Sequence, residues 1–434
     1  MFEIHHGLRH SHLCPHCRRP VRASGFVLAA GRSLGSGTCG QCGRKLLFDL
    51  PVGFGILYPA CLDQATGDVF GPEVGTWFRD RLRRAWIGRG NDSRAPLRIE
   101  VRKAARRIVL CNCLDDVYGH VLFKLFGVQP YLDLSPDTGV AVLIPSNVRH
   151  LVPQGVSEVW EVDLPLSELT RWNERLGEQL TEAITAKEQA WLGWCYPCPN
   201  PAVNAFGLVR PSGRSRLPRG RPLIAFCYRE DRTWGRSLRA QARNLRRLAA
   251  LLSGRYPSAS LVLTGCGGSK PAIDGCEDYR SLRPDAEREQ VWIDLWAAAD
   301  LAIGVHGSNM LLPTSLAKVS IDLLPKGHYA NIFQDTLPNP LLTEPRAGLF
   351  GLRTIYGDEH LGDVKPELLA DVAVSTIDGL ERFLALERAA RCFADPSEFA
   401  SGVPQAIAAL ERFRQRPGSS TPGADGDFEE PARG

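Results

Sequence analysis

The stretch "DLAIGVHGSNMLLPTSLAKVSIDLLP", residues 300–325, decides the fold that the sequence predicts. Its first apolar run ends at Val305, four small or polar residues follow, and a second apolar run then begins. A short apolar run that ends in this way is typical of a buried parallel strand followed by a helix. The stretch therefore predicts a strand at 300–305, a helix at 308–317 and a further strand at 318–324.

The same alternation of strand and helix extends over most of the second half of the chain. Strands are predicted at 222–228 and 259–265, and helices at 235–257, 288–299 and 379–415. Alternation of this kind indicates a doubly wound α/β sheet. From Arg416 onward the chain has too few apolar residues to fold, so we expect a disordered tail.

The first half alternates in a similar way after residue 106. The pattern predicts strands at 107–112, 129–134, 139–145 and 158–165, and helices at 114–127 and 166–192. We therefore expect an α/β fold with two doubly wound, Rossmann-like domains that face a cleft.

The 434 residues are too many for one ordinary core. A segment rich in proline, glycine, serine and arginine at 211–222 predicts a linker between the two sheets. The expected division is a small module at 1–50, an N-terminal Rossmann-like domain at 95–210, a C-terminal Rossmann-like domain at 221–385, C-terminal helices at 386–415 and a tail at 416–434.

Charge and hydropathy exclude several classes of protein. The net charge of +4 gives no global field for nucleic acid, and the basic runs at 79–94 and 210–222 are typical of solvated faces. No apolar run reaches the roughly 18 residues that span a bilayer. The N-terminus lacks the apolar core of a signal peptide, so we expect a cytoplasmic protein without a membrane span.

Four of the thirteen cysteines form two C-x-x-C pairs, Cys14 with Cys17 and Cys39 with Cys42, separated by 21 residues. Two such knuckles facing each other place four thiolates around one zinc ion. Because the four sulfurs complete a closed tetrahedron without His12 or His16, we predict a structural zinc ribbon.

Two further cysteine pairs have no matching partner pair nearby. Cys195 and Cys198 lie in a proline-rich segment, which argues against a redox motif. Cys111 lies in the predicted strand at 107–112, and Cys113 directly follows that strand. We interpret both pairs as structural thiols.

The polar segment His306-Gly307-Ser308-Asn309 lies between a predicted strand and a predicted helix. Backbone N–H groups at such a junction bind anions, and a glycine there allows a phosphate to approach closely. The alternative is a plain capped turn with a surface histidine.

Arg229 and Arg232 follow the strand at 222–228 and should lie at the same rim of the sheet as His306. Arginines beside a helix N-terminus form a phosphate clamp, and the glycines of "LTGCGGS" (263–269) end another strand at this rim. Salt bridges of these arginines with Glu230 and Asp231 are the alternative. The three strand ends together predict a nucleotide-diphosphate site.

These segments resemble the GT-B glycosyltransferase family of plant xylosyltransferases and the EGF-domain O-linked N-acetylglucosamine transferase. The resemblance rests on residues 299–325, on "VYGHVLFKL" at 117–125 and on the strand end at 226–232. In this chain Ser308 stands where the family has Ala or Gly, and Val121 stands at a Trp-like position.

The resemblance implies transfer of a sugar from a nucleotide-diphosphate donor to a glycan or glycan-precursor acceptor without a catalytic metal. It assigns Arg229 and Arg232 to the diphosphate, with the backbone amides of Gly307, Ser308 and Asn309, and His306 to the nucleotide or sugar. The acceptor's base would be His120 or Asp116, with Asp115 as a further candidate.

Two other functions stay open at this point. One is a zinc-ribbon protein that binds nucleic acid or protein, although nucleic acid is disfavoured by the charge. The other is a GT-B relative that hydrolyses or epimerises a sugar nucleotide.

Overall fold

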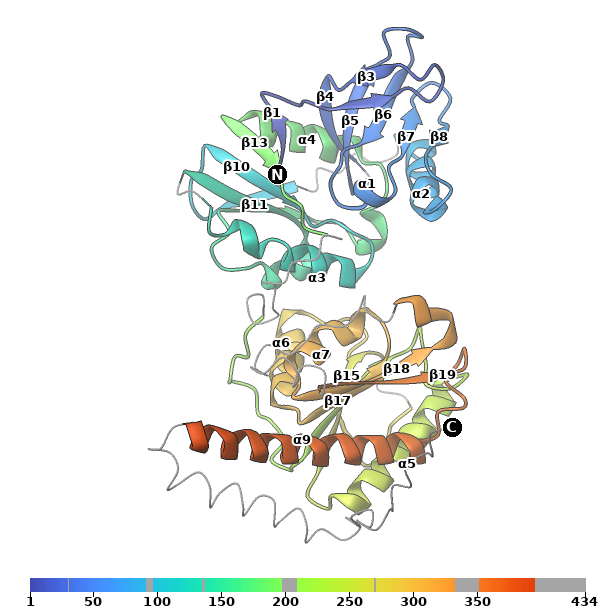
Figure 1. The fold of residues 1–434 in the computed structure, drawn as a ribbon, viewed down its shortest axis with the longest axis vertical. Coiled ribbons are helices and arrows are strands. Elements are labelled where there is room, and N and C mark those ends of the chain that lie inside the picture. The colour runs from blue at the N-terminus through green and yellow to red at the C-terminus, as the bar shows by residue number, and fades with distance from the viewer. Residues whose placement is uncertain are drawn as a thin grey trace, which may run out of the picture.

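The structure is a computed structural model that describes residues 1–29, 31–90, 97–134, 137–196, 209–268, 271–331 and 351–394. It contains two six-stranded sheets, a five-stranded sheet and a two-stranded sheet. Figure 1 shows the first six-stranded sheet above the second, with the N-terminal strands and α2 beside the first. Cys198, the predicted helical residues 395–415 and the whole predicted tail at 416–434 lie outside the described residues.

The first six-stranded sheet, called the first sheet below, has the order β1-β13-β10-β11-β12-β9. Its four inner strands run parallel, and both edge strands are antiparallel to their neighbours. The strands are β1 (Phe2–His5), β9 (Leu97–Val101), β10 (Arg107–Asn112), β11 (Thr138–Pro145), β12 (Glu158–Val162) and β13 (Gln189–Leu192). Helices α3 (Tyr118–Phe126) and α4 (Glu174–Thr185) belong to separate buried clusters with opposite-facing residues of β10, so they cover opposite faces.

Three predictions for this half were wrong. Residues 129–134 do not form a strand: Gln129–Tyr131 is a 3₁₀ turn, and Pro130 in it has no N–H to donate to a ladder. The predicted helix at 114–127 begins only at Tyr118, because the Asp115 carboxylate accepts a hydrogen bond from the Val117 amide in a preceding turn.

The predicted helix at 166–192 is three elements rather than one. Leu166–Glu168 forms a 3₁₀ turn, Asn173 caps α4 by accepting from the Leu176 amide, and Gln189–Leu192 is strand β13. The last segment pairs with β10 in the sheet, so tertiary pairing outweighs the helical pattern of the sequence.

The second six-stranded sheet, called the second sheet, has the order β16-β15-β14-β17-β18-β19, and all its strands are parallel. The strands are β14 (Leu223–Arg229), β15 (Ser260–Cys266), β16 (Glu277–Asp278), β17 (Leu301–Val305), β18 (Val319–Pro325) and β19 (Leu352–Gly357). In chain order this is 3-2-1-4-5-6, the order of a Rossmann fold. Its switch point lies between β14 and β17, where ligands bind in open α/β sheets.

Helices cover both faces of the second sheet. On one face α5 (Leu238–Arg255) packs against α9 (Pro366–Ala394), and on the other lie α6 (Ala286–Ala298) and α7 (Leu311–Leu316). The predicted helix at 308–317 starts as a 3₁₀ turn, Ser308–Met310, before α7. The C-terminal helix starts before its predicted residue 379, at Pro366.

The N-terminal module, as we call residues 11–90, packs beside the first sheet. It consists of the hairpin β2 (Ser11–Leu13) and β3 (Pro20–Arg22), a five-stranded antiparallel sheet, and helices α1 (Phe54–Leu57) and α2 (Thr76–Ile87). The five strands are β4 (Gly25–Ala29), β5 (Arg32–Thr38), β6 (Lys45–Asp49), β7 (Cys61–Asp63) and β8 (Val69–Phe70). The module therefore continues beyond the predicted boundary at residue 50, whereas β1 belongs to the first sheet.

A single apolar cluster contains side chains from both large sheets. It includes Val121 and Leu122 of α3 together with Trp292 of α6 and Leu311 of α7. The two halves therefore share buried apolar surface. No helix in the described ranges has both the length and the apolar character needed to cross a bilayer.

Candidate functional site

The four cysteines of the N-terminal module lie together. Their sulfur atoms are all within 4.8 Å of one another, with Cys14 and Cys42 3.6 Å apart and Cys17 and Cys39 3.4 Å apart. A tetrahedron of Zn–S bonds of about 2.3 Å has sulfur separations of about 3.8 Å, so the set fits zinc.

Equivalent turns build the two halves of this cluster. The amide of Arg18 donates to the Cys14 carbonyl, and the amide of Gly43 donates to the Cys39 carbonyl. Both donors have positive φ, 61° and 69°. Glycine adopts positive φ at little cost, as at Gly43. Arg18 adopts the same conformation although it carries a side chain. His16 does not join the cluster, because its Nε2 pairs with Asp63 at 2.9 Å.

At the switch point of the second sheet, two arginines converge on one loop. The Arg229 guanidinium donates to the His306 carbonyl at 3.2 Å and to the Asn309 side-chain oxygen at 2.9 Å. Arg232 also donates to the His306 carbonyl. We call Arg229, Arg232 and residues 306–309 the arginine corner.

Gly307 makes the arginine corner possible. Its φ of 143° lies in a region that L side chains rarely adopt. A Cβ at this position would collide with the Arg229 guanidinium and would lie 3.1 Å from that of Arg232. The backbone conformation therefore favours glycine at this position, and a side chain there would also force the flexible Arg229 guanidinium to shift.

The salt-bridge alternative for these arginines is present in part. Asp231 pairs with Arg229 through two hydrogen bonds, at 2.8 and 2.5 Å, and these bonds lower the pKa of the Asp231 carboxyl. Its side chain is 71% exposed, so water can take over its side of the pair. Glu230 instead accepts from the Gly268 amide.

Two histidines at this rim differ in their surroundings. His306 is fully buried, and its Nδ1 lies 2.5 Å from Asp322 of β18. His328, in the 3₁₀ turn Lys326–Asn331, lies with its ring 6.5 Å from that of His306. Burial lowers the pKa of His328, and Arg232 lowers it further. No sequence motif pointed to His328, because its place beside His306 depends on the conformation of the 3₁₀ turn that follows β18.

The start of α3 meets the arginine corner directly. A Cβ at Gly119 would lie 2.7 Å from the side chain of Ser308, so glycine allows the two loops to touch. Beside this contact, the Tyr118 hydroxyl donates to Glu289 of α6, and His150 Nε2 lies 2.8 Å from the same carboxylate. The two predicted motifs therefore lie next to each other across the boundary between the halves.

His120 forms a pair with Asp115 rather than with Asp116. Its Nδ1 lies 3.1 Å from the Asp115 carboxylate, whose other oxygen accepts from Lys124 at 3.0 Å. Burial opposes the charge of Asp115, but Lys124 and His120 outweigh burial and hold its pKa well below the ordinary value.

Asp116 lies in a different environment. Arg81 of α2 donates to its carboxylate at 2.7 Å. Burial nevertheless raises the pKa of Asp116, and the negative charge of Asp115 adds to this increase against the effect of Arg81. The N-terminal module therefore contributes the direct partner of one predicted catalytic residue.

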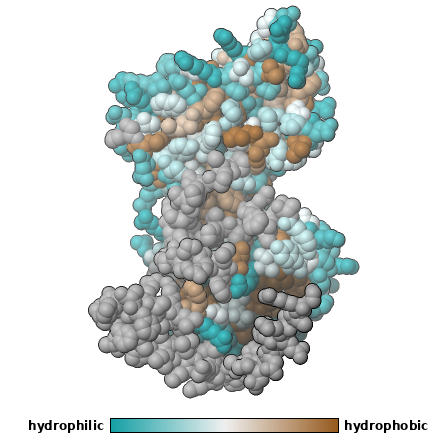
Figure 2. Space-filling view, in the orientation of Figure 1, coloured by the Kyte–Doolittle hydropathy of each residue, from teal (hydrophilic) through white to brown (hydrophobic). Residues whose placement is uncertain are grey.

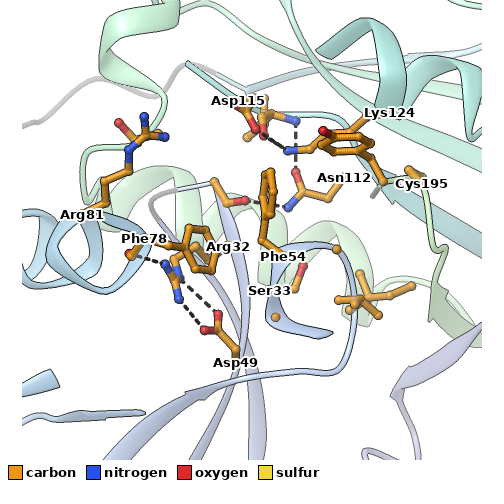
Figure 3. Close-up of a pocket in the computed structure, with 18 of the residues that line it drawn as sticks. Arg32, Ser33, Asp49, Phe54, Phe78, Arg81, Asn112, Asp115, Lys124 and Cys195 are labelled. Carbon is orange, nitrogen blue, oxygen red and sulfur yellow. Dashed lines mark hydrogen bonds and ion pairs between the residues drawn. The ribbon is translucent and has the colours of Figure 1, made fainter. Parts of the chain in front are cut away.

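A cavity of about 70 Å³ opens beside Asp115, between the N-terminal module and the carboxyl ends of β10 and β13. Figure 3 shows Arg32 paired with Asp49 on the module side, and Lys124 paired with Asp115 on the side of the first sheet. Phe54 lines the cavity, and its ring lies 5.5 Å from that of His120.

Cys111, Cys113 and Cys195 belong to one buried apolar cluster. Burial raises the pKa of the Cys113 thiol, which lies close enough to Cys195 for the two thiols to interact. Their burial in the core is the environment expected of structural thiols.

No family model matches the chain, and no curated protein matches it. Among solved structures, the chain is similar to ADP-heptose LPS heptosyltransferase II of E. coli, with 14% identity over 63% of this chain and 99% of that chain and a TM-score of 0.39. It is also similar to E. coli heptosyltransferase WaaC with ADP, with 11% identity over 61% of this chain and 96% of that chain and a TM-score of 0.34. The function therefore has to be inferred from the chain's own residues.

Proposed function

We propose that the chain is a GT-B glycosyltransferase that moves a sugar from a nucleotide-diphosphate donor to a glycan or glycan-precursor acceptor, without a catalytic metal. The observation that carries the proposal is the arginine corner at the switch point of the second sheet. Two guanidinium groups and a glycine-containing loop meet there, next to the helix that bears His120.

The donor's diphosphate would bind at the arginine corner. Guanidinium groups match phosphate oxygens in geometry and stay charged at all relevant pH values. Because Asp231 is exposed, it can rotate into water when phosphate oxygens take its place on Arg229. The two arginines would then offset the charge that develops on the departing nucleoside diphosphate.

The acceptor's proton would go to His120. With Nδ1 protonated and donating to Asp115, Nε2 is the basic nitrogen, as in other Asp–His pairs. Asp116 is the second candidate, but it must first give up its pair with Arg81. The acceptor itself would approach from the first half, on the side of the cavity next to Asp115.

The zinc site has a structural role in this proposal. Four sulfur ligands would fill the coordination sphere of the ion, so no position stays open for substrate. The ion would hold the two turns together, while the module contributes Arg81 to the surroundings of Asp116.

A panel of UDP-, GDP- and ADP-sugars tests the proposal. We expect at least one of them to raise the melting temperature of the protein and, with a glycan acceptor mixture, to give a glycosylated product. Product analysis separates transfer from hydrolysis, which releases free sugar, and from epimerisation, which leaves the nucleotide attached. The proposal fails if no sugar nucleotide stabilises the protein.

A further inference from the structure

Large apolar side chains are exposed on the N-terminal module, over α1 and α2. Their exposed fractions range from 42% to 72%, and they are Ile56, Leu57, Val74, Trp77 and Ile87. Figure 2 shows hydrophobic side chains in the area where Figure 1 places α1 and α2. We call these five side chains the α1–α2 surface.

Ring contacts join α1 to the start of α2. Trp77 lies 5.7 Å from the ring of Phe54 and 6.0 Å from that of Tyr58. The exposed residues Ile56 and Leu57 lie between Phe54 and Tyr58 in the chain. Because these rings contact one another, the apolar groups of α1 and of the α2 N-terminus form one continuous patch. Such a patch differs from single apolar residues scattered over a surface, which are common and need no explanation.

Along α2, one face carries the exposed groups. Trp77, Arg84 and Ile87 follow the spacing of a single helical face, whereas Leu82 and Trp86 are buried on the opposite one. The helix lies with its inner face on the module and leaves its outer face to solvent. A flat partner can contact this outer face along the whole length of α2.

Positive charge surrounds the patch. The segment 71–90 has two acidic residues, Glu73 and Asp80, against five arginines, Arg79, Arg81, Arg83, Arg84 and Arg89. Arg81 is paired with Asp116, but Arg83 and Arg84 are exposed and make no ion pair with any residue in the described ranges. The patch is therefore apolar at its centre and cationic at its margin.

We propose that the α1–α2 surface docks on the anionic face of a lipid bilayer. Aliphatic and indole side chains enter the headgroup region, and arginines beside them pair with anionic headgroups. The phosphates of a nucleic acid would pair with the Arg83 and Arg84 guanidinium groups. They would offer no apolar contact to Ile56, Leu57 and Val74. The lipid surface satisfies both parts of the patch at once.

Vesicle flotation tests this proposal on the full chain. With vesicles of equal parts phosphatidylcholine and phosphatidylglycerol we expect binding that weakens as salt is added, and with phosphatidylcholine alone we expect much weaker binding. Reversing two charges, Arg83→Glu with Arg84→Glu, should weaken binding on the order of tenfold or more. Val74→Ser with Ile87→Ser, which changes two highly exposed apolar side chains, should also reduce binding.

Matched variants in the second half serve as controls. Arg239→Glu with Arg243→Glu reverses two exposed charges on α5, and Leu282→Ser removes an exposed apolar side chain. These controls should bind vesicles like the wild type, and all variants should keep its melting temperature. The proposal is overturned if the wild type binds neither vesicle, if both vesicles bind equally, or if the α2 variants and the controls behave alike. A protein partner on this surface would give the first of these outcomes.

Discussion

Gly307 is the residue on which the geometry of the arginine corner depends. It follows His306 at the end of β17, and its backbone conformation brings the His306 carbonyl toward both arginines. The sequence predicted this glycine as a point of close approach to a ligand. In the structure the groups that approach it most closely are guanidinium groups, which would in turn hold the ligand.

We expect Gly307→Ala to lower the free energy of unfolding by about 1–3 kcal/mol, because the added Cβ is strained at this φ. It should also displace Arg229 and weaken sugar-nucleotide binding. Gly254→Ala in α5 is the control, since no atom lies within 4 Å of its Cβ position, and helix propensity should make it neutral or slightly stabilising. Urea unfolding measures both variants, and equal effects would contradict this account of Gly307.

Lys124 keeps the buried Asp115 charged, and Lys124→Met removes that cation. At neutral pH the uncompensated carboxylate should cost about 3–5 kcal/mol of stability. In the wild type the depressed pKa of Asp115 contributes stability that is complete above the ordinary carboxyl pKa and is lost as the pH falls below it.

In the Lys124→Met variant burial raises the pKa of Asp115, so protonation relieves the cost. The difference between variant and wild type should therefore be largest at neutral pH and shrink as the pH falls into the ordinary carboxyl range. Lys318→Met, which breaks a more exposed pair with Asp300, should cost about 1 kcal/mol or less. A difference that does not change with pH would rule out this role for Lys124.

At the level of helices and strands, the four central strands of the second sheet could be predicted from the sequence because they are short and largely apolar. The edge strands β16 (Glu277–Asp278) and β19 (Leu352–Gly357) were not predicted, because neither is an apolar run. The pattern at 222–228, 259–265 and 300–305 is confirmed by β14, β15 and β17. In the first half, β13 could not be found, because its alternation of buried and half-buried residues is masked by the preceding amphipathic helix.

The candidate site could be predicted only in part, for a similar reason. Arg229, Arg232 and His306 each follow an apolar strand, so topology alone puts them at one rim. The carboxylate that pairs with His120 could not be predicted, because Asp115 and Asp116 are adjacent in the chain. Only the conformation of the turn before α3 determines which of the two reaches the His120 ring. His328 and Arg81 come from turns and helices whose position no local pattern reveals.

The four-cysteine cluster should bind zinc and stabilise the module's hairpins. We expect atomic absorption to find about one zinc ion per chain, and Cys39→Ser to lose the metal and to destabilise the module. Cys266→Ser, at an exposed cysteine outside the cluster, is the control. A metal-free wild type that folds normally would exclude the zinc site.

Across the whole molecule, the two halves are held together by shared apolar surface and by one buried carboxylate. Glu289 of the second half accepts from Tyr118 and pairs with His150, both of the first half. This contact lies next to the point where Gly119 meets Ser308. The relative position of the arginine corner and His120 therefore depends on Glu289.

We expect Glu289→Gln to lower the free energy of unfolding by about 1.5–3 kcal/mol, because hydrogen bonds to a charged group are replaced by neutral ones. Glu287→Gln, at an exposed glutamate two residues earlier in α6, should have little effect. Urea unfolding of both variants decides this point. Equal stability of the two would mean that the carboxylate does not link the halves.

Calorimetric titration of UDP-, GDP- and ADP-sugars into the wild type, Arg229→Ala and Arg239→Ala tests the central claim most directly. If the arginine corner holds a diphosphate, the wild type binds at least one of these donors and Arg229→Ala weakens that binding by about 1.5–3 kcal/mol, roughly tenfold or more. Arg239→Ala, at an exposed arginine of α5, should bind like the wild type. Unchanged affinity in Arg229→Ala, or no binding of any sugar nucleotide to the wild type, would contradict the account.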